Sequence, residues 1–415
     1  MTAELADARS LTVNVAVGVG SRYEDYPKNG GVSHFLEHLL FKGSPKYPSP
    51  QAIAEAIDAV GGYTNAYTAE DITSYYIKVP ARHGELALDI LCDIVRAPLL
   101  DSDEIDRERG VVVEEMNVFR DDPSRFIGTL VPELIFPNNP LGRDIIGSEE
   151  VVKHITRDEI AAYFKQHYRP NNMVVAAAGA VKHEAVVAVV KSGLSECKPL
   201  ERAKPEAAPE APSSKLSIAL QKATAQAHFM VASRAYAHDD PEEPASRVVA
   251  AILGRGLSSR LFTNVRERQG LAYTVYAEVN SYTDTGLFEA YAGVNLDKIE
   301  QALDSVLHEL DLIRLEPVST SELHKAQQQL IAGLEMSLES NSAIADRIGG
   351  QLVLLGRVKP IDEIISGIEK VTVSDVSSVA AKMLAPEALR FAIIAPEPEG
   401  VAKHFEEQIN VKVKR

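Results

Sequence analysis

A proline-rich segment divides the chain into two halves of similar length. Lys198–Lys215 (KPLERAKPEAAPEAPSSK) carries four prolines among Glu, Ala and Ser, a composition that forms neither a core strand nor a core helix. At 415 residues the chain is also longer than one hydrophobic core usually supports. We therefore expect an exposed linker at 198–215 between two domains, residues 1–197 and residues 216–415.

Both halves show the same order of sequence patterns. An alternating strand leads to a helix, an extended segment rich in Tyr and Thr, two long amphipathic helices and a final strand. This order predicts an α+β fold with two homologous α/β-sandwich domains, each an antiparallel-rich sheet backed by helices, joined by the Pro/Ala-rich linker. The matched segments are Ser10–Gly18, Gly31–Lys42, Tyr63–Val79, Glu85–Arg96, Ser102–Arg120 and Asn172–Gly179 in the first half, and Lys215–Ala219 with Ala227–Ala232, Glu242–Leu253, Tyr273–Gly293, Lys298–Leu315, Thr320–Glu339 and Leu389–Ala395 in the second.

The net charge and the cysteine content of the chain indicate which binding partners and which cellular compartment to expect. A formal net charge of −16 disfavours nucleic-acid binding, which needs a surplus of Lys and Arg, and is compatible with basic peptides. Cys92 and Cys197 form no CxxC pair, as expected in a reducing compartment. Met1–Asp7 shows no signal-peptide pattern, and no apolar run approaches the length of about 18 residues that a spanning helix needs. We expect a cytoplasmic protein with neither nucleic-acid nor membrane partners.

The first half contains a short motif, His34-Phe35-Leu36-Glu37-His38, that the second half lacks. On a helix His34 and His38 project from one face, a geometry in which two neutral imidazoles can share a zinc ion. Glu37 reaches the same face, where a carboxylate can take a proton from water and return it to a leaving amine. This H-x-x-E-H order is the inverzincin motif of zinc peptidases.

The alternative interpretation of the motif is an ordinary helix face, either solvated or packed in a core. The neighbouring residues Phe35, Leu36, Leu39, Leu40 and Phe41 are apolar and indicate that the helix is buried. Three ionisable side chains on a buried helix are costly unless they are paired or bound to a metal. We therefore favour zinc as the explanation of this motif.

A catalytic zinc site needs a third protein ligand, and the predicted helix Ser102–Arg120 is its best source. Glu108 and Glu115 lie two turns apart on one face of this helix, whereas Glu114 is rotated by about 100° from Glu115. Glu115 is therefore a candidate ligand, and Glu108 can support the site electrostatically or orient a ligand. From spacing alone, Glu114 and ordinary surface charges stay open as alternatives.

At this point the chain resembles the pitrilysin, or insulinase, type of zinc metallopeptidases, which includes insulin-degrading enzyme and mitochondrial processing peptidase. Gly30–Pro48 (GGVSHFLEHLLFKGSPKYP) is similar to the zinc-helix signature of the processing-peptidase branch. The third ligand of the family follows the second histidine by 77 residues, which here selects Glu115. A supporting glutamate seven residues earlier matches Glu108. The resemblance implies one zinc ion per chain, held by His34, His38 and Glu115.

A second stretch resembles the edge strand with which the family binds peptides. Gly61–Thr68 (GGYTNAYT) is similar to a strand that pairs with the substrate backbone, and Asn65 and Ala66 would be the substrate-binding positions. Without the resemblance, a plain hairpin strand would explain the stretch, because Tyr and Thr favour sheets in any case.

In the second half, Ser259–Tyr273 resembles the segment that carries an Arg/Tyr pair with the spacing R-x6-Y. This spacing selects Arg266 and Tyr273. The resemblance implies that the tyrosine hydroxyl helps to stabilise the oxyanion, and that the arginine binds substrate carbonyls or positions the tyrosine. The alternative is a surface arginine near a packed strand tyrosine.

The combined pattern predicts a zinc-dependent metalloendopeptidase that hydrolyses peptides or unfolded polypeptides in an enclosed chamber. Water activated at the metal would be the nucleophile and Glu37 its general base, and the linker could act as a hinge or tether. The alternative is a non-catalytic assembly or core subunit of a larger complex, although such relatives typically lose a ligand or the base. Because the chain keeps both the zinc motif and the Arg/Tyr pair, we expect a homodimer rather than an obligate heterodimer.

Overall fold

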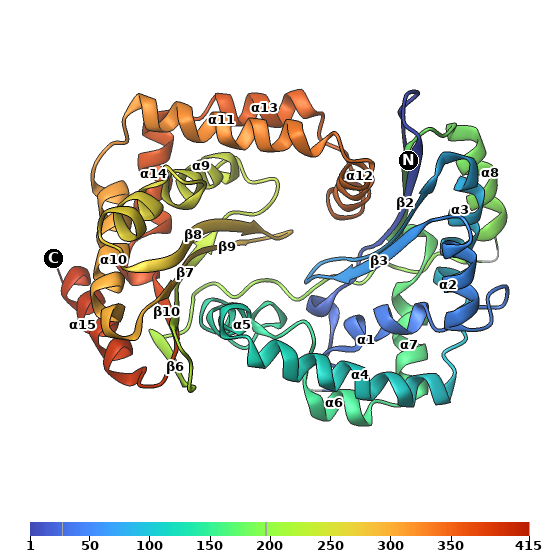
Figure 1. Cartoon of the computed structure of the whole chain (residues 1–415), viewed down its shortest axis with the longest axis horizontal. Helices are drawn as coiled ribbons and strands as arrows, with labels where there is room; N and C mark the ends of the chain where they lie inside the picture. The colour runs from blue at the N-terminus through green and yellow to red at the C-terminus, as the bar shows by residue number, and fades with distance from the viewer. Residues whose placement is uncertain (27, 196, 415) are drawn as a thin grey trace. The chain divides into compact units, whose positions relative to one another are not determined.

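The computed structural model describes residues 1–26, 28–195 and 197–414, and it contains two compact units, each built on a five-stranded sheet (Figure 1). The strand order is β1-β5-β2-β4-β3 in the first sheet and β6-β10-β7-β9-β8 in the second. In each sheet the first pair of this order is parallel and all other neighbours are antiparallel. The shared topology confirms the predicted α+β duplication. The strands are β1 (Thr2–Glu4), β2 (Ser10–Val17), β3 (Tyr63–Thr68), β4 (Thr73–Pro80), β5 (Met173–Gly179), β6 (Ser217–Gln221), β7 (Ala227–Ala235), β8 (Ala272–Ser281), β9 (Gly286–Val294) and β10 (Arg390–Ala395).

Helices cover both faces of each sheet, and turns of 3-10 or π type join several of the elements. The α-helices are α1 (Val32–Leu40), α2 (Pro50–Asp58), α3 (Gly84–Arg96), α4 (Ser102–Asp121), α5 (Pro123–Ile135), α6 (Glu149–His154), α7 (Arg157–His167), α8 (His183–Gly193), α9 (Glu243–Gly254), α10 (Ile299–Leu315), α11 (Thr320–Ser337), α12 (Asn341–Leu355), α13 (Ile361–Glu369), α14 (Val373–Met383) and α15 (Glu399–Val413). A π-helical turn spans Phe262–Arg268, and 3-10 turns span Ser21–Tyr23, Ala81–His83, Pro140–Gly142, Pro170–Asn172, Leu296–Lys298 and Pro386–Ala388.

In the first unit, the two faces of the sheet differ in character. Because side chains alternate along a strand, β2 directs Val13 and Val15 into a large apolar core that includes α1 and α3. The opposite face of the sheet is covered by α12, which packs on β2 and β5 (Figure 1). A Cβ at Gly349 of α12 would lie 3.2 Å from the Cβ of Ala16, so a residue without a side chain allows this helix to approach the sheet closely.

The second unit repeats this arrangement with a helix from the other end of the sequence. Phe229 and Val231 of β7 belong to the main core of this unit, whereas Met230 packs with Ile127 and Val131 of α5 on the opposite face. Each sheet is thus covered on one face by a helix from the other half of the chain. The first unit comprises Met1–Asn117, Asp144–Glu206 and Glu335–Lys359, and the second comprises Val118–Arg143, Ala207–Leu334 and Pro360–Arg415.

The linker Lys198–Lys215 contains neither helix nor strand, as predicted. Its two ends bind different units. Arg202 donates a hydrogen bond of 2.7 Å from Nη2 to the backbone oxygen of Val353 in the first unit. The backbone oxygen of Ser213 accepts a hydrogen bond of 2.8 Å from Nε of Arg390 in the second unit. Both ends of the linker are therefore anchored by hydrogen bonds.

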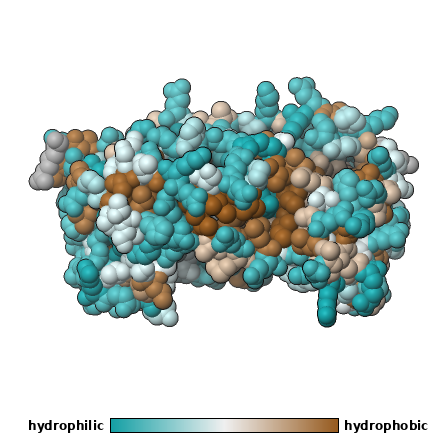
Figure 2. Space-filling model, turned by 90° about the horizontal axis from the view of Figure 1, so that it is seen from above, coloured by the Kyte–Doolittle hydropathy of each residue, from teal (hydrophilic) through white to brown (hydrophobic). Residues whose placement is uncertain are grey.

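Apolar side chains also reach the surface. Figure 2 shows a face on which hydrophilic residues dominate and hydrophobic residues gather in patches. Two large hydrophobic residues of the second unit stand out by their exposure, Leu257 at 77% and Tyr273 at 72%. Among the residues that the structure describes, none of the helices combines the length and the apolar character that crossing a membrane requires.

Candidate metal centre

Helix α1, which carries the H-x-x-E-H motif, begins at a buried carboxylate. Its N-cap, Gly31, has a φ of +94°, and a Cβ there would collide with the backbone oxygen of Ile146, so glycine is required. Glu24 is 7% exposed and accepts hydrogen bonds from the N–H groups of Gly31 at 2.7 Å and Ser33 at 2.8 Å. Burial raises the pKa of Glu24 to about 8, against the opposing effect of these donors. Glu24 thus caps α1 from a distance and fixes where the helix starts.

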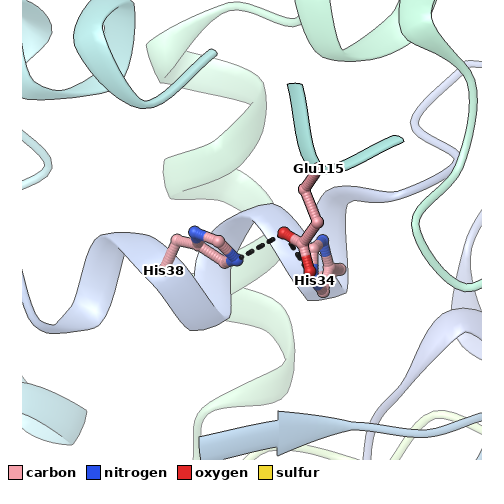
Figure 3. A group of neighbouring side chains, drawn as sticks. All are labelled: His34, His38 and Glu115. Atoms are coloured by element: carbon pink, nitrogen blue, oxygen red, sulfur yellow. Dashed lines mark ion pairs between the residues drawn. The ribbon is translucent and has the colours of Figure 1, made fainter. Parts of the chain in front are cut away.

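Three potential ligands converge in the first unit, two from α1 and one from α4 (Figure 3). The rings of His34 and His38 have their centroids 4.7 Å apart on one face of α1. Oε2 of Glu115 lies 3.4 Å from Nε2 of His38 and 3.7 Å from Nε2 of His34. Bonds of about 2.0–2.2 Å around a tetrahedral zinc ion would place its ligand atoms at about this spacing. The three side chains therefore match a zinc-sized cation.

Glu108 and Lys42 support the ring of His38. Oε1 of Glu108 lies 2.9 Å from Nδ1 of His38, and Oε2 of the same carboxylate lies 2.7 Å from Nζ of Lys42. When the ring of His38 is neutral, donation of a hydrogen bond from Nδ1 to Glu108 leaves the lone pair on Nε2, the nitrogen that faces Glu115. Burial disfavours a charged His38, but the hydrogen bonds with Glu108 and Glu115 outweigh it and raise the pKa of His38 to about 9. The two carboxylates thus attract positive charge to this position.

His34 provides a second indication that the site suits a cation. Burial, followed by the proximity of His38, lowers the pKa of His34 to about 4, which favours a neutral ring. Nδ1 of His34 is buried, and no hydrogen-bond partner for it occurs among the described residues. If the proton is on Nδ1, the lone pair of Nε2 faces the carboxylate of Glu115 with unfavourable electrostatics. A divalent cation bound to Nε2 would remove this repulsion, so the donor set of two imidazoles and one carboxylate fits zinc.

Glu37 lies on α1 beside His38 and contacts the neighbouring strand. Its Oε2 accepts a hydrogen bond of 2.6 Å from Oγ1 of Thr68, the last residue of β3. Burial raises the pKa of Glu37, while the bond from Thr68 acts in the opposite direction. A carboxylate whose pKa is raised toward neutrality is suited to accept and release protons.

The structure places the other residues of the predicted site as follows. The cluster of potential ligands includes Glu115 and does not include Glu114. Asn65 and Ala66 lie on β3, the edge strand of the first sheet, with Asn65 exposed. Within the described part of the chain, β4 is the strand that pairs with β3, and no strand pairs with the other edge of β3.

Arg266 and Tyr273 meet in the second unit. Cζ of Arg266 lies 5.5 Å from the ring centroid of Tyr273 and 4.7 Å from that of Phe262, so the guanidinium packs against both rings. Tyr273 follows the sharp turn at Gly270 and is the second residue of β8. The spacing R-x6-Y thus brings the predicted pair into contact and leaves the tyrosine ring largely exposed to solvent.

Three residues of the site were not identified from the sequence. Lys42 follows His38 by four residues, so helical spacing could have indicated its proximity to the site. Glu24 and Thr68 reach α1 from a preceding turn and a following strand. No local pattern in the sequence marks such contacts, because they depend on how the chain folds back.

Comparisons with known proteins place this chain in one family. The model described as insulinase, peptidase family M16, matches residues 1–149, and the model described as peptidase M16 inactive domain matches residues 154–330. An uncharacterized zinc protease of Streptomyces coelicolor is 36% identical over 92% of this chain and 84% of its own length. A probable mitochondrial-processing peptidase subunit beta of Arabidopsis thaliana is 32% identical over 94% of this chain and 75% of its own length. The chain belongs to peptidase family M16, and it is similar to the processing-peptidase branch of that family.

Solved structures share the fold at low sequence identity. A protease from Helicobacter pylori has a TM-score of 0.87 at 22% identity and covers 95% of this chain and 96% of its own. A protein from Pseudomonas fluorescens described as a peptidase M16 inactive domain has a TM-score of 0.86 at 21% identity and covers 95% of each chain. These similarities confirm that both halves of the chain adopt the fold of the family.

Proposed function

We propose that this protein is a zinc-dependent metalloendopeptidase that hydrolyses peptides or unfolded polypeptides. The observation that carries the proposal is the convergence of His34, His38 and Glu115 (Figure 3). Glu37 precedes His38 on the same helix, α1. Zinc held by His34, His38 and Glu115 would lower the pKa of a water molecule and polarise the scissile carbonyl. The zinc proteases among the relatives support this assignment.

Glu37, Glu108 and Lys42 have different roles in the proposed reaction. Glu37 accepts the proton of the attacking water and delivers it to the departing amine. Glu108 holds the ring of His38 through Nδ1. Burial raises the pKa of Glu108, but its hydrogen bond with His38 and its ion pair with Lys42 at 2.7 Å outweigh this effect and lower the pKa. These contacts would hold the metal ligands in a fixed geometry close to the general base Glu37.

The substrate would bind as an additional strand on β3. Among the residues that the structure describes, β3 pairs with β4 alone, so its other side can form backbone hydrogen bonds with an extended peptide. Asn65 and Ala66 would contact that peptide. Recognition through the backbone makes few demands on sequence and selects flexible chains, which we propose are held in an enclosed chamber of a cytoplasmic homodimer.

Metal analysis combined with peptide cleavage tests the proposal. We expect the purified protein to contain close to one zinc ion per chain and to cleave an unfolded peptide in a reaction that a chelator stops and added zinc restores. The measurements are elemental analysis and mass spectrometry of the cleavage products. Zinc well below one per chain together with no cleavage of any unfolded peptide would instead favour the non-catalytic assembly subunit.

We further propose that Tyr273 stabilises the developing oxyanion and that Arg266 holds its ring in place. The substitution Tyr273→Phe should then lower kcat by about 100-fold or more, as loss of one oxyanion donor does in other hydrolases. Because this side chain is 72% exposed, the melting temperature and zinc content should not change. Steady-state kinetics provides the measurement, with Thr274→Ala, at the next position of β8, as the control. An unchanged kcat in Tyr273→Phe would remove the second unit from the chemistry.

A further inference from the structure

We infer that Thr68 is a positioning residue that orients the Glu37 carboxylate and links it to the peptide-binding edge of the first sheet. This inference rests on the proposed function. Oγ1 of Thr68 lies 2.6 Å from Oε2 of Glu37, a length typical of a hydroxyl that donates to an ionised carboxylate. This bond occupies Oε2 of Glu37. The other oxygen, Oε1, is then the atom that accepts and releases protons.

The hydroxyl of Thr68 has a rigid support. Thr68 pairs with Thr73 at the end of the β3–β4 hairpin, and the turn is closed by a hydrogen bond of 2.8 Å from the N–H of Ala69 to the oxygen of Ile72. The backbone oxygen of Ala69 in turn accepts from the N–H of Ser21 at 3.1 Å. Because a β-branched side chain has little freedom about χ1, Oγ1 occupies a well-defined position. Glu37 has three rotatable side-chain bonds, so it gains most of its orientation from such a fixed partner.

The end of β3 is also held on its other face. The hydroxyl of Tyr67 donates a hydrogen bond of 2.6 Å to Oδ1 of Asp346 on α12. Oδ1 of Asp346 also accepts from Nδ2 of Asn14 on β2 at 3.3 Å. Consecutive residues of β3 therefore contact α12 on one face and the proposed general base on the other, as the alternation of strand side chains requires.

Thr68 thus couples the position of the edge strand β3 to the position of the Glu37 carboxylate. A peptide that adds to β3 takes its register from the backbone of that strand, a few residues from Thr68. The same strand end holds the carboxylate that must reach the water and the leaving amine. Thr68 therefore sets the distance between the peptide bond and the base, and its effect should fall on kcat more than on KM.

Substitutions at Thr68 test the inference in the full-length, zinc-loaded protein. Thr68→Val keeps the shape and removes the hydroxyl, and we expect kcat to fall by about 10–100-fold with KM and zinc affinity changed less than about threefold. Thr68→Ser restores the hydroxyl and should recover most of kcat. In a Glu37→Gln background, Thr68→Val should cause no further loss, because the group that it positions is no longer a base.

Thr73→Val is the matched control, because Thr73 pairs with Thr68 at the same end of the hairpin but lies on β4, and its hydroxyl donates to the backbone oxygen of Val19 at 2.8 Å instead of to the base. It should leave kcat within about threefold of the wild type if only the bond to Glu37 matters. Three results would overturn the inference: an unchanged kcat in Thr68→Val, a loss confined to KM, or no recovery in Thr68→Ser. An active wild type with any of these results refutes only the role of Thr68, whereas an inactive wild type refutes the proposed function and this inference together.

Discussion

Glu37→Gln should reduce peptide hydrolysis by about 100- to 10,000-fold while zinc stays bound, because the change removes the general base and leaves the ligands in place. The amide is close in shape to the carboxylate, and its oxygen can still accept the hydrogen bond that Thr68 donates at 2.6 Å. The fold and the metal affinity should therefore survive. The measurements are kcat on an unfolded peptide, zinc per chain and the melting temperature.

Glu114→Gln provides the control for this experiment. Glu114 is an exposed carboxylate in the first unit that lies outside the cluster of potential ligands, so its neutralisation should change kcat by less than about twofold. Both variants should be purified in the same way, since residual activity in Glu37→Gln also measures any contaminating peptidase. A Glu37→Gln protein with nearly full activity would exclude Glu37 as the base.

The second large effect is expected at the metal ligand from α4. Glu115→Gln replaces a charged oxygen 3.4 Å from Nε2 of His38 by a neutral amide, and neutral amides are poor zinc ligands. We expect zinc affinity to fall by more than about 100-fold, beyond what loss of a supporting residue costs. Glu108→Gln should fall within that smaller range, about 10- to 100-fold, because Glu108 acts through His38.

Chelator competition measures these affinities directly, and it does not depend on any substrate. Glu114→Gln again serves as the control and should bind zinc as the wild type does. The ordering wild type, Glu108→Gln, Glu115→Gln is the expected result. The assignment of ligands would be wrong if Glu114→Gln lost zinc while Glu115→Gln retained it.

Much of the fold was predictable because it depends on repeated local patterns. The strand patterns around Ser10–Gly18 and Ala227–Ala232 indicated two equivalent sheets. The exchange of α5 and α12 was not predictable in this way. An apolar stripe such as that of Ile127 and Val131 shows that a helix must pack, but it does not specify on which sheet.

The candidate site was also predictable only where it depends on local sequence patterns. His34, Glu37 and His38 follow from spacing on a single helix, and the choice of Glu115 over Glu114 needed the resemblance or the three-dimensional cluster. Thr68 escaped notice because its role depends on a contact between a strand end and a helix that lie 31 residues apart in sequence. Contacts of this kind arise only when tertiary structure brings unrelated segments together.

The packing of α12 on the first sheet also has a consequence for biosynthesis. The last strand of that sheet ends at Gly179, but the helix that covers its second face is complete only at Leu355. At a translation rate of about 5–20 residues per second, this face of the sheet stays uncovered on the order of ten seconds or more before α12 has been synthesised. The waiting face carries the polar residues Thr12 and Asn14 of β2, which bond to Ser342 and Asp346 of α12. Water can therefore hydrate these polar groups until α12 packs over them, and this hydration limits aggregation of the nascent chain.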